Sequence, residues 1–132
     1  MRILTWREFD CCVKAISNLY LDVDFSGVYG FPRGGLCLAV ATSHALSIPL
    51  LDTPQENSLV LDDIYETGFT LNTIKNLDNF TAFVWVSKVE PDWWQAFEIV
   101  DSKEWIVFPW ENRKSAAEEM VIYRESRALL SD

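Results

Sequence analysis

The sequence predicts an α/β fold with a mainly parallel central sheet and helices on both faces. One observation is the apolar run at residues 59–61, which is typical of a strand buried on both faces of a parallel sheet. Another is the alternation of short apolar runs with segments of helical periodicity, which favours parallel strands joined by helices. With 132 residues, of which 49% are hydrophobic, we expect one globular domain spanning residues 1–132.

The first part of the chain predicts a helix, a strand and a second helix. Thr5 and Glu8 have the spacing of a capping box, and apolar residues at helical spacing then predict an amphipathic helix to about Tyr20. Residues 25–29 are expected to form the first strand. A loop with three glycines follows at residues 30–35 and opens a helix at 36–46, which is apolar nearly all round and therefore buried.

The second part predicts further strands around the one that contains residues 59–61. Residues 48–51 are expected to form a short strand, and residues 52–57 form a polar turn before the central strand, which ends at Asp62 and Asp63. Helical spacing at 71–77, an apolar strand at 80–86 and shorter apolar runs at 97–100 and 105–108 follow. Ser115 and Glu118 predict the start of a last helix by the capping-box pattern.

Composition excludes several classes of function. Eleven basic and twenty acidic side chains give a net charge of −9, which argues against nucleic acid as a partner because phosphate contacts need clustered Lys and Arg. No apolar run is long enough to span a membrane, and no signal segment opens the chain. Three cysteines make no disulfide framework, so we expect a reduced, cytoplasmic protein. The single histidine, His44, excludes a His-rich metal site.

The end of the central strand has the chemistry of a sugar-phosphate site. Asp62 and Asp63 lie where open α/β sheets bind ligands, and we expect them to be exposed in a cleft as acceptors for sugar hydroxyls. The following loop, from Thr67 to Thr70, offers hydroxyls and backbone N–H groups that suit a phosphate. The simpler interpretation is that the two acids merely finish a strand and that Thr67 caps a helix.

Three motifs carry a resemblance to a known family. Residues 60–70 resemble the phosphoribosyl diphosphate (PRPP) motif of type I phosphoribosyltransferases, with an apolar strand, two acids, a third acid and Thr-Gly-x-Thr. Phe31-Pro32-Arg33-Gly34-Gly35-Leu36 resembles the diphosphate-binding loop of that family. Trp105-Ile106-Val107-Phe108-Pro109-Trp110-Glu111 is similar to the C-terminal signature of bacterial xanthine-guanine phosphoribosyltransferases, and Lys88 matches the family lysine that contacts the purine 6-oxygen.

The resemblance implies the type I phosphoribosyltransferase fold and transfer of 5-phosphoribosyl from PRPP to a 6-oxopurine, with release of pyrophosphate, in nucleotide salvage. It implies that Asp62 and Asp63 hold the ribose and, through PRPP, Mg²⁺, and that Glu66 handles the purine N7 proton. Base contacts are implied within about residues 88–111, from Lys88, Trp105 and Ile106. The implied PRPP-binding residues are Pro32, Arg33, Gly34, Asp62, Asp63, Ile64, Tyr65, Glu66, Thr67, Gly68, Phe69 and Thr70. We expect a homodimer or a higher homo-oligomer.

Two features depart from the family pattern. Glu66 stands where the family usually has Asp, so its carboxylate reaches about one bond further. The turn at residues 52–57 is too short for the mobile loop that closes over the site and excludes water. Either the site stays open and transfer is slow, or a neighbouring subunit covers it, with Trp93 and Trp94 as candidates. The alternatives are a weak or inactive PRPP- or nucleotide-binding regulator and a transferase for another base, although Lys88 argues against adenine.

Overall fold

The computed structural model describes the backbone of residues 1–131 and the side chains up to residue 128. The chain divides into two compact units, one made of Asp10–Ser102 and the other of Met1–Phe9 with Lys103–Asp132. Each unit has a sheet of its own. That residues 1–132 act as one domain stays a prediction. No helix among residues 1–131 combines the length and the apolar character needed to cross a lipid bilayer.

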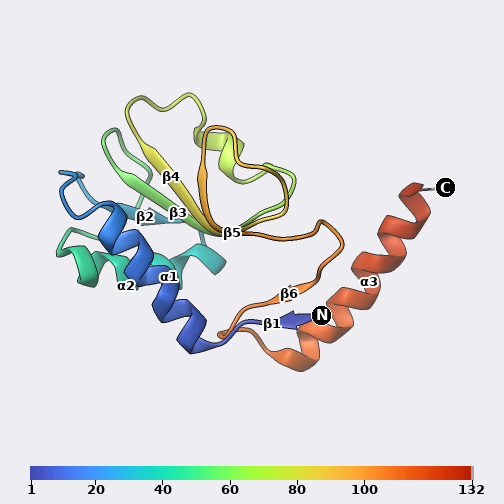
Figure 1. Cartoon of the computed structure of the whole chain (residues 1–132). Coiled ribbons are helices and arrows are strands. Elements are labelled where there is room, and N and C mark those ends of the chain that lie inside the picture. Colours follow the sequence, from blue (N-terminus) through green and yellow to red (C-terminus); the bar gives the residue numbers. More distant parts are fainter. Residues whose placement is uncertain (132) are drawn as a thin grey trace. The chain divides into compact units, whose positions relative to one another are not determined.

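The larger unit is built on a four-stranded sheet whose neighbouring strands all run parallel (Figure 1). Its strands, in spatial order, are β2 (Val28–Gly30), β3 (Leu59–Tyr65), β4 (Thr81–Ser87) and β5 (Gln95–Ile99). The two central strands, β3 and β4, are buried over most of their length, as the apolar runs predicted. The predicted α/β class with a mainly parallel sheet is confirmed.

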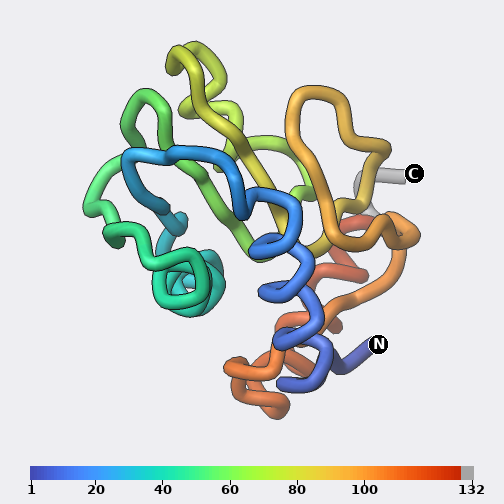
Figure 2. The backbone as a smooth tube through the Cα atoms, turned by 60° about the vertical axis from the view of Figure 1, so that its left-hand side comes forward, coloured from blue at the N-terminus to red at the C-terminus, as the bar shows by residue number. Residues whose placement is uncertain are grey.

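Helices α1 (Trp6–Leu19) and α2 (Gly34–Leu46) lie on the same face of this sheet (Figures 1 and 2). On that face Phe83 of β4 packs edge-on against Tyr20, which follows α1, at a centroid distance of 6.2 Å. On the opposite face, residues 10–102 of this unit contribute a short 3₁₀ helix, η1 (Leu71–Ile74), whose two end residues pack with Val60 and other buried side chains. The helix expected at 71–77 is therefore a single turn.

The connector between α2 and β3 lies at the amino edge of the sheet. The strand expected at 48–51 is reduced to one parallel bridge between Leu50 and Val28. Residues 52–57 then turn directly into β3 and lie beside the loop that precedes β4 (Figure 2). Asn57 joins these loops, because its N–H donates to the Asn79 carbonyl (2.7 Å) and its carbonyl accepts from the Ser26 N–H (2.8 Å).

The smaller unit contains a two-stranded parallel sheet and a long helix. Strand β1 (Arg2–Ile3), which was not predicted, pairs with β6 (Ile106–Val107), a shorter strand than the one expected at 105–108. Helix α3 (Arg113–Ser131) begins two residues before the predicted start. The cap is Asn112, whose side-chain oxygen accepts from the Ser115 N–H at 3.0 Å. The capping box predicted for Ser115 and Glu118 is thus wrong by one turn.

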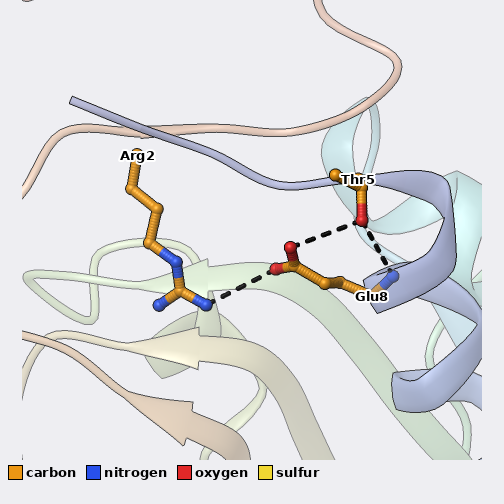
Figure 3. A network of polar contacts seen from close by, with 3 residues as sticks. All are labelled: Arg2, Thr5 and Glu8. Atoms are coloured by element: carbon orange, nitrogen blue, oxygen red, sulfur yellow. Dashed lines mark hydrogen bonds and ion pairs between the residues drawn. The ribbon is translucent and has the colours of Figure 1, made fainter.

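The capping box at the start of α1 is confirmed. The Glu8 N–H donates to Thr5 Oγ1 at 3.1 Å, and the Thr5 hydroxyl donates to Glu8 Oε1 at 3.3 Å. Arg2 adds an ion pair to the same glutamate, with Nη2 at 3.4 Å from Oε2 (Figure 3). The network fixes the direction in which the chain leaves β1 and enters α1.

Candidate functional site

Three loops converge at the carboxyl edge of the four-stranded sheet. They are residues 31–33 after β2, residues 66–70 after β3 and residues 88–94 after β4. Parallel strands present their carboxyl ends at one edge, which is where open α/β sheets bind ligands. Because Gly30 pairs with Leu61, β3 continues four residues beyond the end of β2 and carries Asp62 and Asp63 past it.

The loop after β2 is held close to β3. The Phe31 N–H donates to the Leu61 carbonyl at 3.0 Å, and the Gly35 N–H donates to the Phe31 carbonyl at 2.8 Å. A Cβ at Gly35 would lie 2.7 Å from the Leu61 carbonyl oxygen, so only glycine allows this approach. The Pro32–Arg33 peptide bond is cis, and Arg33 is exposed. The N–H groups of Arg33 and Gly34 donate to no acceptor within residues 1–131, so they are available to a ligand.

Asp62 and Asp63 form a closely coupled pair next to this loop. The Asp63 N–H donates to Asp62 Oδ1 and the Ile64 N–H donates to Asp63 Oδ1, both at 2.8 Å. Burial, the charge of Asp63 and a hydrogen bond between the two side chains raise the pKa of Asp62 to about 8. Burial also raises the pKa of Asp63.

The expectation that both acids are exposed in a cleft is wrong for Asp62, which is only 7% exposed, whereas Asp63 is half-buried. The reason is the first turn of α2, where Gly35 packs directly on the backbone of Leu61 and Asp62. Gly34 approaches the other acid even more closely, because a Cβ there would overlap the Asp63 carboxylate. The carboxyl pair and the loop after β2 therefore form one site.

The loop from Thr67 to Thr70 has the conformation of an anion cradle. Gly68 has a positive φ of 81°, and a Cβ there would overlap the Tyr65 hydroxyl and lie 2.9 Å from Asn72 Nδ2. The Phe69 N–H donates to Thr67 Oγ1 at 3.4 Å. The N–H groups of Thr67, Gly68 and Thr70 have no acceptor in the part of the chain that the structure describes. Successive backbone N–H groups in such a turn bind anions.

Glu66 and Lys88 meet at the same edge as a partly buried ion pair. Lys88 Nζ lies 3.0 Å from Glu66 Oε1, and the exposed fractions of the two side chains are 3% and 29%. The pairing follows from the sheet register, because Tyr65 pairs with Ser87 and each charged residue directly follows the last residue of its strand. The two side chains that the sequence predicted to handle the base are thus in contact with each other.

Trp94 belongs to the core of this unit, so it is unsuited to covering a neighbouring subunit. It is 6% exposed and stacks on Tyr65, with ring centroids 3.7 Å apart and planes inclined by 13°. Its indole N–H donates to Ser87 Oγ at 3.3 Å, and the Ser87 hydroxyl donates to the Val89 carbonyl at 2.6 Å. Sequence reasoning missed Ser87, whose only signal was a hydroxyl at the end of an otherwise apolar strand.

Trp105 and Ile106, the other predicted base contacts, belong to the smaller unit. Trp105 packs against Tyr123 of α3 with ring centroids 5.1 Å apart, and Ile106 is 6% exposed within β6. Their role in base binding stays a prediction.

Magnesium would need oxygen ligands from a bound substrate as well as from this site. No group of three His, Cys, Asp or Glu side chains among residues 1–131 could hold a metal ion. Asp62 and Asp63 supply carboxylate oxygens, which suit a hard divalent cation, but only as an adjacent pair. The pair could therefore take part in holding a divalent cation only together with oxygen atoms of a bound ligand.

Comparisons with known proteins agree with this geometry. No family model matches the chain. It is 27% identical to the xanthine-guanine phosphoribosyltransferase of Desulfotalea psychrophila over 152 residues, with 94% of each chain covered. It is 26% identical to that of Chromohalobacter salexigens over 149 residues, with 94% of this chain and 92% of the relative covered. The crystal structure of a purine phosphoribosyltransferase from Pyrococcus horikoshii superimposes with a TM-score of 0.70 at 25% identity, covering 84% of this chain and 94% of the other.

Both alignments are longer than the 132 residues of this chain, so both relatives have residues that it lacks. The PRPP-like motif, the parallel sheet and these similarities over nearly the whole length all point the same way. In sequence and in fold, the chain resembles type I phosphoribosyltransferases that act on purines.

Proposed function

We propose that the protein transfers the 5-phosphoribosyl group from PRPP to a 6-oxopurine, namely guanine, xanthine or hypoxanthine, and releases pyrophosphate. The observation that carries this proposal is the contact between the Asp62–Asp63 pair and Gly34, which joins the acidic motif to the loop after β2. A ligand with a ribose, a 5-phosphate and a diphosphate needs these two elements and the Thr67–Thr70 cradle side by side.

In the proposed reaction a purine nitrogen forms a bond to ribose C1 as the bond from C1 to pyrophosphate breaks. Asp62 and Asp63 accept hydrogen bonds from the ribose hydroxyls and stabilise the positive charge that develops on the sugar. The N–H groups of Thr67, Gly68 and Thr70 hold the 5-phosphate, and Ile64, Tyr65 and Phe69 shape that loop. Pro32, Arg33 and Gly34 bind the pyrophosphate. Mg²⁺, bound together with PRPP, would neutralise the charge of the leaving group.

The base is proposed to bind between the charged groups that follow β3 and β4. Glu66 accepts the proton that leaves the purine N7, since it occupies the place of the family acid. Lys88 donates to the 6-oxo oxygen, which favours 6-oxopurines over adenine, whose 6-amino group is a donor. For Trp105 and Ile106, it is the resemblance of residues 105–111 to the family signature that supports contacts with the ring and its 2-position.

A second candidate is a regulator that binds PRPP or a nucleotide with little or no turnover. The position of residues 52–57 favours it, because this connector is tied to the amino edge through Asn57. The seven residues of β3 span about 20 Å between that edge and the carboxyl edge, so the connector cannot cover the site. An uncovered site admits water and lacks the donors that a closing loop supplies.

One experiment separates the two candidates. The protein is incubated with Mg²⁺ and PRPP, and guanine, xanthine, hypoxanthine, adenine and uracil are added separately while nucleotide and pyrophosphate are measured. Product with the 6-oxopurines supports the transferase. PRPP binding by calorimetry without product supports the regulator. A protein that binds no PRPP refutes both, and a preference for adenine or uracil refutes the base assignment.

The proposal includes a cytoplasmic homo-oligomer that binds neither nucleic acid nor membranes. Free Cys11 is exposed and Cys12 is buried, so the protein suits a reducing compartment. Light scattering of the purified protein measures the oligomeric state.

A further inference from the structure

The turn at Gly68 brings together polar groups from three residues. Gly68 is buried and has a φ of 81°, and its N–H has no acceptor among the residues that the structure describes. A Cβ built on Gly68 would overlap the Tyr65 hydroxyl and would lie 2.9 Å from Asn72 Nδ2. A backbone N–H, a hydroxyl and a side-chain amide therefore surround one point beside the loop. A buried N–H without an acceptor is rare, which indicates that a ligand supplies one.

The Tyr65 hydroxyl is held at this point by the packing of its ring. The ring stacks on Trp94 with centroids 3.7 Å apart, and the Trp94 indole N–H donates to Ser87 Oγ at 3.3 Å. The hydroxyl forms no hydrogen bond with another residue in the described part of the chain. A hydroxyl carries one O–H donor, so the Tyr65 side chain presents a fixed donor that a ligand can use.

Asn72 is fixed to the same turn through its backbone. It is the second residue of η1, and its N–H donates to the Gly68 carbonyl at 2.8 Å. Its side chain is exposed and forms no hydrogen bond within residues 1–131. The amide has two N–H donors, which rotation of the side chain can present in either assignment of its nitrogen and oxygen. The PRPP-like motif ends at Thr70, so it assigns no role to Asn72.

We propose that Asn72 and the Tyr65 hydroxyl complete the anion cradle by donating hydrogen bonds to the phosphate of a phosphate monoester. This inference rests on the proposed function, in which that phosphate is the 5-phosphate of PRPP. A phosphate dianion accepts several hydrogen bonds at once, and bonds to a charged acceptor are stronger than bonds to a neutral one. An unphosphorylated ribose would leave these donors without an acceptor. The two side chains therefore select for a phosphorylated sugar.

Small substitutions separate these donors from the packing around them. Tyr65→Phe removes the hydroxyl and keeps the ring that stacks on Trp94. Asn72→Ala removes the amide, and Asn72→Asp keeps its size but replaces the donor by a negative charge that repels phosphate. Tyr20→Phe is the control for the hydroxyl, because Tyr20 is buried on the face of the sheet that carries α1. Asn76→Ala is the control for the amide, because Asn76 is exposed and lies beyond η1.

The test measures the affinity for ribose 5-phosphate by calorimetry, and urea denaturation confirms that each variant is folded. We expect Tyr65→Phe and Asn72→Ala each to weaken binding by about tenfold or more, and Asn72→Asp to weaken it further. Both controls should bind as the wild type does. The proposal is overturned if the wild type binds no ribose 5-phosphate, or if Tyr65→Phe and Asn72→Ala bind it unchanged. It is also overturned if Asn72→Asp binds as tightly as Asn72→Ala, because the side chain then does not face the phosphate.

Failure of this inference can be distinguished from failure of the proposed function. Nucleotide formation from PRPP and a 6-oxopurine is measured on the same preparations. If ribose 5-phosphate binding depends on Tyr65 and Asn72 but no nucleotide forms, the transferase fails and the assignment of the two donors stands. If nucleotide forms and all variants bind ribose 5-phosphate equally, the assignment of the two donors fails alone.

Discussion

Substituting Gly34 by alanine tests the central feature of the proposed site, which is the contact between the loop after β2 and the acidic pair. Gly34 is the first residue of α2. A Cβ built there overlaps Oδ2 and Cγ of Asp63 and lies 2.8 Å from Oδ1. Since non-bonded atoms approach to about 3.5 Å, the carboxylate must move by roughly an ångström or more. No backbone atom is among the three nearest to the new methyl group, so the helix itself need not shift.

The expected effect is large on ligand binding and small on stability. Alanine is better than glycine in a helix by about 1 kcal/mol, which offsets the cost of moving one partly exposed carboxylate. We therefore expect the free energy of unfolding to change by no more than about 1 kcal/mol. Hydrogen bonds from ribose hydroxyls to a charged carboxylate contribute about 1.5–3 kcal/mol, so losing them should weaken PRPP binding by about ten- to a hundredfold.

Calorimetry with PRPP and Mg²⁺ and urea denaturation of the same samples measure the two effects. Gly27→Ala is the matched control, because its Cβ would lie 2.7 Å from the Pro49 carbonyl oxygen and from Leu51 at the amino edge. This control should lose stability and keep its PRPP affinity. The reasoning is refuted if folded Gly34→Ala binds PRPP as the wild type does, or if folded Gly27→Ala loses as much affinity.

Three further outcomes are expected. Gly68→Ala should abolish binding of ribose 5-phosphate and destabilise the fold by about 1–3 kcal/mol, because position 68 has a φ of 81° and faces the Tyr65 hydroxyl. Unchanged binding of ribose 5-phosphate, measured by calorimetry, would contradict the anion cradle. The pKa of Asp62 is raised from 3.8 to about 8, so the folded protein retains a proton that the unfolded chain releases between these values. The free energy of unfolding should therefore fall as the pH rises from about 4 to 8. Asp62→Asn should flatten this decline in urea titrations at pH 5 and pH 8, and a slope identical to that of the wild type argues against the burial of Asp62. Asn57→Ala should lower the free energy of unfolding by about 1–3 kcal/mol, because it removes side-chain hydrogen bonds to the Asp24 carbonyl and to Asn79. It should leave the PRPP affinity unchanged. A loss of PRPP affinity would mean that the amino edge takes part in binding.

The parts of the site that the sequence predicted well are those set by local chemistry. A run of apolar residues that ends in Asp62 and Asp63 places two acids at the carboxyl end of a buried strand, whatever the rest of the chain does. Gly68 and the threonines beside it likewise indicate a turn from their own conformational preferences. The start of α1 was predictable for the same reason, because Thr5 and Glu8 bond to each other.

The parts that could not be predicted depend on contacts between distant segments. The burial of Asp62 comes from Gly35, which lies far from it in sequence but packs on its backbone. From the sequence, Trp94 was a candidate for covering the site of a neighbouring subunit. Its stacking on Tyr65 instead makes it part of the core. Helical spacing at residues 71–77 predicted a helix, but only a 3₁₀ turn forms where Leu71 and Ile74 pack on the sheet. In each case tertiary packing decides between local alternatives of similar free energy.

For the connector at residues 52–57, its position in the fold matters as well as its small number of residues. From the sequence, its shortness alone suggested a site without a closing loop. In the structure it also ends at Asn57, which is bonded to the loops that contain Asp24, Ser26 and Asn79. Even a mobile connector would therefore move at the amino edge, about 10–13 Å from Asp62 and Asp63 along β3 and about 20 Å from the end of that strand. Water is kept from Lys88 instead by burial and by the carboxylate of Glu66.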